Sequence, residues 1–254
     1  MSAHWAARAE KGPTDLALGY VAALPLFLAY ELGQDAARAR APAERIVAHA
    51  LAPLEGRLQW VRVALLLTFA AFAALHALRA RDADGRGLPR RLGRQVLEGW
   101  LFGFLLGPLL LVLHGWLSAE TLDVAPPLAR SLGACLLLMG AAPWEELLFR
   151  VCVYGGLFLA TRRTSAFLGL ASRLAHALAE LAALLGSALL FAWFHLESAQ
   201  RHLGADGEPY HAGLFLWRLS AGILLGALFR WRGFGVAAWA HGVFNLGIAL
   251  GIRA

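Results

Sequence analysis

The chain has 254 residues, of which 59% are apolar and only 16% charged, and its mean hydropathy is +0.59. Soluble domains are close to half apolar and a quarter charged, so this composition predicts a protein that crosses the membrane several times. The net charge of +6 comes from arginines clustered between apolar segments, which argues against nucleic-acid binding. Cys135 and Cys152 fall inside apolar segments, where we expect small buried side chains and no disulfide framework.

Seven apolar segments are long enough to be transmembrane helices, which need about 17–25 mostly apolar residues. In chain order they are residues 16–32, 63–78, 96–117, 128–160, 174–196, 212–229 and 234–251. The fourth is too long for one simple crossing, so either Pro143 breaks it in two or a tilted helix extends beyond the bilayer. An eighth span results if that segment or the stretch 164–172 folds back. The pattern predicts an all-α membrane protein, a bundle of about seven or eight transmembrane helices, in a single polytopic domain covering residues 1–254.

The distribution of arginines predicts how the bundle is oriented. The 79–95 and 161–173 loops are rich in arginine, and Arg230 and Arg232 follow the sixth segment. Basic loops stay in the cytoplasm, so these loops and the N-terminus are expected there, in what we expect to be a bacterial inner membrane. The 33–57 segment has mixed charge and lies on the opposite side, where we expect an interfacial helix.

Three short motifs place ionisable and amide side chains inside apolar segments. They are Glu145-Glu146-x-x-x-Arg150, Phe191-x-x-x-His195 and His241-x-x-x-Asn245. A charged group in hydrocarbon costs several kcal/mol, so such residues are expected to be paired and to mark a functional interior. We therefore expect the bundle to enclose a buried polar active site, in a catalytic core of about residues 128–251.

The first motif divides its two carboxylates between two faces of a helix. Glu146 and Arg150 are four residues apart and share a face, whereas Glu145 points about a hundred degrees away. We expect Arg150 to neutralise Glu146 and to leave Glu145 facing a cavity, where it can act as a general base. The alternative is a charge cluster at a helix end in the headgroup region.

The other two motifs supply imidazoles and an amide. His195 together with Glu145 can hold and deprotonate a water molecule, and His241 and Asn245 share a helical stripe from which both can donate to an oxyanion. Equally, Glu145, His195 and His241 could be the three protein ligands of a catalytic metal. The sequence contains no His-Glu-x-x-His helix of the zinc proteases and no Gly-x-Ser-x-Gly serine motif.

Taken together, in this order and each within a hydrophobic segment, the motifs resemble those of the CPBP family. This family comprises the CAAX prenyl endopeptidases and the bacteriocin-processing or abortive-infection-type membrane proteases. The resemblance spans residues 145–245 and implies an intramembrane endopeptidase that hydrolyses a membrane-associated protein or peptide within the lipid bilayer. It implies that the first Glu and first His activate water and that the second His and the Asn stabilise the oxyanion. Carried over to this sequence, the catalytic residues are Glu145, His195, His241 and Asn245, and the supporting residues are Glu146, Arg150 and Phe191.

The resemblance leaves the cofactor open, because the family is described both as metalloproteases and as glutamate proteases. We expect no cofactor, with zinc as the alternative, because Asn245 suits an oxyanion donor and neutral amides are uncommon zinc ligands. If a metal is used, its ligands are Glu145, His195 and His241.

Two other classes of membrane protein remain alternatives. In a transporter or channel, Glu145, Glu146, Arg150 and Arg218 would line an ion or proton path. That class predicts an inverted repeat, which the sequence does not show. A non-catalytic scaffold or immunity protein would keep the fold without needing the intact motifs.

Overall fold

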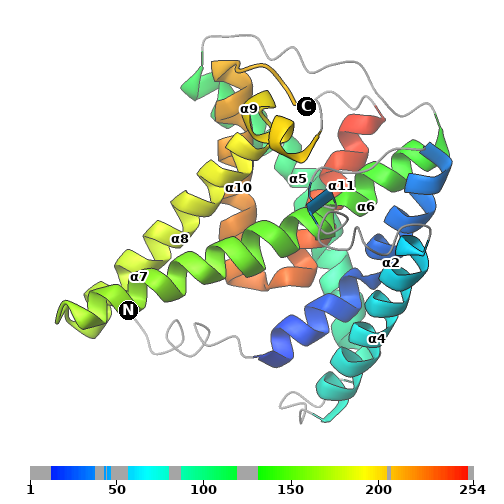
Figure 1. Cartoon of the computed structure of the whole chain (residues 1–254), viewed down its shortest axis with the longest axis horizontal. Coiled ribbons are helices and arrows are strands. Elements are labelled where there is room, and N and C mark those ends of the chain that lie inside the picture. The colour runs from blue at the N-terminus through cyan, green and yellow to red at the C-terminus, as the bar shows by residue number, and fades with distance from the viewer. Residues whose placement is uncertain are drawn as a thin grey trace.

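The computed structural model describes residues 13–37, 43, 45–46, 57–79, 87–118, 131–204 and 207–250. The interfacial helix predicted within 33–57 lies largely outside these residues. The described chain forms only helices, with one isolated bridge between Leu196 and Glu208. In chain order the elements are α2 (Pro13–Ala37), α4 (Leu58–Arg79), α5 (Leu88–Leu117), α6 (Leu132–Glu146), the π-helix η2 (Leu147–Tyr154), α7 (Gly155–Phe167), α8 (Ser172–Phe194), α9 (Glu197–Gln200), the 3-10 turn η3 (Arg201–Leu203), α10 (Ala212–Arg232) and α11 (Phe234–Ala249) (Figure 1).

The predicted all-α membrane bundle is confirmed. Within the described residues, six helices are long and apolar enough to cross a membrane. Large apolar side chains such as Leu97, Leu101 and Phe104 are exposed on one of them, α5, as a lipid-facing surface requires. The seventh predicted span corresponds to α11, whose 16 residues are fewer than a full crossing needs.

The long fourth segment is one continuous helix, and Pro143 does not break it. Pro143 lies inside α6, which runs on through η2 into α7 to give a 36-residue apolar stretch, Leu132–Phe167. At 1.5 Å per residue such a helix is roughly 50 Å long, well beyond the ~30 Å hydrocarbon core. The tilted or extended helix is therefore the correct alternative. Gly169, with a φ of 74°, then turns the chain from α7 into α8.

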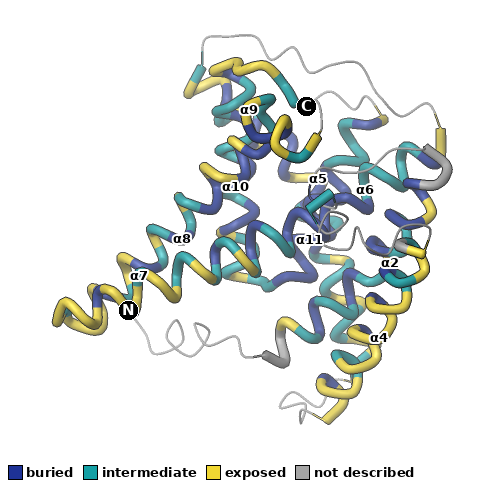
Figure 2. Tube along the Cα trace, in the orientation of Figure 1, coloured by how far each residue is buried: buried dark blue, intermediate teal, exposed yellow. Residues whose placement is uncertain are grey.

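Helix α11 lies at the centre of the bundle and is buried over most of its length (Figure 2). Glycines let α5 approach it, because a Cβ added at Gly103 would lie 2.6 Å from the Cβ of Val243. Helix α2 packs on α6 equally tightly, since a Cβ at Gly140 would overlap the backbone of Tyr30. This close packing fixes the position of α11, the helix that carries the third motif.

Two groups of helices diverge from this centre (Figure 1). Helices α7, α8 and α10 form one arm, and α2 and α4 lie in the other. In the first arm α10 packs on α8 where a Cβ at Gly222 would lie 3.0 Å from the Cα of Ala188. The expected burial of the cysteines is wrong. Cys152 is exposed on η2 and Cys135 is only partly buried, because both lie on outward faces of a lipid-exposed helix.

Candidate active site

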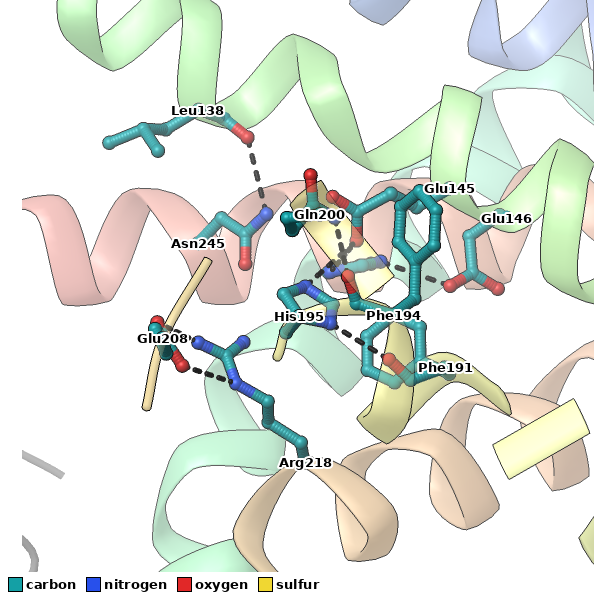
Figure 3. A network of polar contacts seen from close by, with 11 residues as sticks. Leu138, Glu145, Glu146, Phe191, Phe194, His195, Gln200, Glu208, Arg218 and Asn245 are labelled. Atoms are coloured by element: carbon teal, nitrogen blue, oxygen red, sulfur yellow. Dashed lines mark hydrogen bonds and ion pairs between the residues drawn. The ribbon is translucent and has the colours of Figure 1, made fainter. Parts of the chain in front are cut away.

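Three motif side chains converge at the junction of α6, α8 and α11. Glu145 comes from the last turn of α6, His195 caps the C-terminus of α8, and His241 lies in the middle of α11. The Oε2 atom of Glu145 is 3.6 Å from Nε2 of His241 and 3.9 Å from Nε2 of His195. Figure 3 shows Glu145 and His195 approaching from different helices. Glu145, Glu146 and Arg150 are all buried inside the bundle.

Glu146 lies on another face of the same turn and connects two partners. Its carboxylate is 3.1 Å from Nε of Arg150, and neither side chain has any exposed surface. The predicted pairing of Glu146 with Arg150 is confirmed. The second contact was not predicted: Oε1 of Glu146 lies 3.0 Å from Nδ1 of His241. Glu146 therefore joins the buried arginine to a site histidine and orients its ring.

The hydrogen bonds made by the Nδ1 atoms of His195 and His241 fix the tautomers of both rings. His195 Nδ1 is 2.8 Å from the carbonyl oxygen of Phe191, which can only accept, so Nδ1 carries the hydrogen. His241 Nδ1 likewise donates to the Glu146 carboxylate, which also pairs with Arg150. Both Nε2 atoms then face Glu145 with a lone pair unless the ring gains a second proton.

His195 follows the last residue of the α8 span. Burial, and after it the positive charge of Arg218, lowers the pKa of its imidazole below the usual value. The ring is therefore neutral near pH 7. A neutral Nε2 can accept a hydrogen bond from water, which a base or its orienting partner must do.

Phe191 forms the wall between the buried arginine and the two histidines. The guanidinium carbon of Arg150 lies 5.2 Å from the centroid of its ring, at the distance of a cation–π contact. The same ring packs edge to face on His195, with ring centroids 4.8 Å apart, and on His241 at 5.8 Å. An aromatic residue at this position thus packs on all three ionisable groups at once.

Asn245 lies one turn after His241 on α11. One hydrogen of its amide donates to the carbonyl oxygen of Leu138 on α6, at 3.2 Å (Figure 3). Its second hydrogen is left for another acceptor, because a carboxamide nitrogen carries two. The contact with Leu138 holds the amide in place on the α6 side of the site.

Three polar residues near the C-terminal end of α8 were not assigned to the site from the sequence. They are Gln200, Glu208 and Arg218. Gln200 is buried and its amide donates to the carbonyl of Phe194. Arg218, considered above only as part of an ion path, forms two hydrogen bonds with Glu208. None of the three belongs to a short motif, so only the folded arrangement reveals them.

The side chains do not form a metal ligand set in this arrangement. Ligand atoms at about 2.0–2.1 Å from tetrahedral zinc are roughly 3.4 Å apart. The corresponding separations from Oε2 of Glu145 are 3.6 Å to His241 and 3.9 Å to His195. Across the described part of the chain, no group of three or more His, Cys, Asp or Glu side chains is placed to hold a metal ion.

Comparison with known families bears on this site. Residues 127–247 match the family model described as Rce1-like, type II CAAX prenyl endopeptidase. The motif-bearing part of the chain belongs to the Rce1-like family. The Rce1-like match includes all three motifs, so the resemblance drawn from them is confirmed. No curated protein and no solved structure matches the chain.

The Rce1-like region and the six apolar helices together describe the protein's class. It is a multi-pass membrane protein and an intramembrane protease of the CAAX type. Its substrate is accordingly a protein or peptide in the membrane. The family match favours a protease over the transporter and the non-catalytic scaffold.

Proposed function

We propose that this Rce1-like protein is an endopeptidase that hydrolyses a peptide bond within the membrane by direct attack of water, without a metal. The observation that carries the proposal is the convergence of Glu145 with Nε2 of His195 and of His241. Groups separated by more than 3.5 Å are commonly bridged by water. The 3.9 Å between Glu145 and His195 suits a water molecule that donates one hydrogen to each.

The two acceptors activate that water. The water oxygen attacks the carbonyl carbon of the scissile bond while Glu145 takes one of its protons. His195 keeps the other hydrogen in a hydrogen bond to Nε2 and so orients the oxygen. The C–N bond then breaks, and the proton held by Glu145 passes to the leaving nitrogen.

The opposite side of the site stabilises the negative charge that develops on the carbonyl oxygen. His241 can donate from Nε2 only when that nitrogen also carries a hydrogen, since its Nδ1 hydrogen is committed to Glu146. Asn245 supplies the second donor from its free amide hydrogen. Donors of this kind are worth about 10²–10³ in kcat each.

The substrate is a membrane-associated protein or peptide, and the protein resides in a bacterial inner membrane. Family membership alone does not make the substrate prenylated. His195 lies at the end of α8, and the 197–209 loop that follows is expected on the outer side because it is poor in arginine. The site is therefore proposed to cut substrates near the external face.

The test is a peptidase assay of detergent-purified protein against a membrane-peptide library, with wild type beside Glu145→Gln. The substitution keeps the side chain's shape and removes the base. Glu180→Gln serves as a control, since Glu180 is another intramembrane glutamate that pairs with Arg230 away from the site. We expect cleavage by wild type and the control and none by Glu145→Gln. Equal cleavage by all three proteins would refute the proposed function.

A further inference from the structure

Residues 207–210, here called the strap, run across the C-terminal end of α8 beside His195. The backbone N–H of Glu208 donates to the carbonyl of His195 at 3.0 Å, and the N–H of Glu197 donates back to the carbonyl of Glu208 at 2.8 Å. Gly207 permits this approach, since an added Cβ would overlap the backbone of Glu197. The strap thus forms a short backbone pairing with the catalytic histidine's own peptide.

A single arginine ties the strap to the helix bundle. Arg218 on α10 donates to both carboxylate oxygens of Glu208, with a distance of 3.0 Å from Nε to Oε2 (Figure 3). Planar two-point contacts between arginine and carboxylate fix geometry as well as charge. Helix α10 is itself held on α8 one turn later, at the Gly222–Ala188 contact. The arginine therefore links the strap to a rigid element.

We propose that Arg218 is a positioning residue, which through Glu208 holds the strap against His195 and so keeps Nε2 aimed at Glu145. The carbonyls in the last turn of a helix have no partner within the helix, and the strap supplies one to His195. If the strap separates, this turn is free to fray, and the ring loses the backbone that fixes its place. This inference rests on the proposed function, because it assigns Arg218 a part in holding the water-activating pair.

The experiment compares two arginine–glutamate pairs on the same side of the molecule. Arg218→Met and Glu208→Ala remove the strap contact. Arg201→Met is the matched control, because Arg201 pairs with Glu197 four residues earlier and the arginine is 72% exposed. A displacement near 1 Å can cost about 10²-fold in rate. We expect Arg218→Met to lower kcat by about 10–100-fold with KM within about twofold, and Arg201→Met to change neither.

A charge-swapped pair separates positioning from folding. Arg218→Glu combined with Glu208→Arg is expected to recover at least a tenth of wild-type kcat, while either single reversal stays as slow as Arg218→Met. Melting temperatures of all variants are measured in the same detergent. A normal kcat for Arg218→Met would overturn the proposal. The proposal would also be overturned if kcat falls only in parallel with the melting temperature and the charge-swapped pair does not restore it.

Glu145→Gln is assayed alongside to separate the two claims. If Glu145→Gln retains activity, the proposed function itself fails. If Glu145→Gln is inactive and Arg218→Met is as fast as wild type, the proposed function survives and only the role of Arg218 is refuted.

Discussion

Removing Arg150 should destabilise the fold far more than removing the charge of Glu145. Arg150 and Glu146 are both fully buried and 3.1 Å apart, and the guanidinium also packs on the ring of Phe191. Deleting one partner of a buried pair leaves a lone charge and costs roughly 3–5 kcal/mol. At about 2–4 °C per kcal/mol for a chain of this size, Arg150→Ala should melt roughly 6–20 °C below wild type.

The assay is thermal unfolding in detergent, followed by tryptophan fluorescence, with two comparison variants. Glu145→Gln should melt close to wild type, because the histidine nitrogens that face Glu145 lie 3.6 and 3.9 Å away, beyond a hydrogen bond. Arg201→Ala removes an exposed pair worth about 0–1 kcal/mol and controls for loss of an arginine. The reasoning is refuted if Arg150→Ala and Glu145→Gln have the same melting temperature.

Three further predictions follow from particular contacts. Gly140→Ala should lower the melting temperature, because the added Cβ would overlap the backbone of Tyr30. Gly156→Ala is the control and should not lower it, since the space around Gly156 is open. Equal melting temperatures for the two variants would contradict the tight α2–α6 packing. Asn245→Leu should lower kcat about 10²–10³-fold with little change in KM, since the oxyanion exists only in the transition state. A change confined to KM would argue against an oxyanion role for Asn245. Activity should survive exhaustive chelation, measured with metal analysis of the purified enzyme; a loss that zinc alone restores, with about one bound ion per chain, would replace the metal-free mechanism.

Much of the site was predictable because the membrane makes polar residues conspicuous. Glu145, His195 and His241 stand out in apolar segments, and the four-residue spacing alone predicted the Glu146–Arg150 pair. Hydropathy also located the helices. It could not say whether Pro143 breaks its segment, since a proline ends a helix only where the freed backbone groups find no other partner.

Contacts that depend on tertiary structure were beyond the sequence. The bond from Glu146 to His241 joins residues 95 positions apart, and neither belongs to the other's motif. The strap contact of Glu208 with Arg218 joins a loop to a helix, and no short pattern predicts it. The burial of the cysteines was misjudged because an apolar segment does not reveal which of its faces meets lipid and which meets protein.

The central claim is that Glu145 and His195 act on one water, and a double-mutant cycle on kcat tests it most directly. Wild type, Glu145→Gln, His195→Gln and the double variant are assayed on one fluorogenic membrane peptide that wild type cleaves. Residues that act as a unit are not additive, so each single variant should lose about 10²–10⁴-fold and the double variant no more than the slower single one. Losses that multiply in the double variant, or a His195→Gln enzyme as fast as wild type, would contradict a shared water.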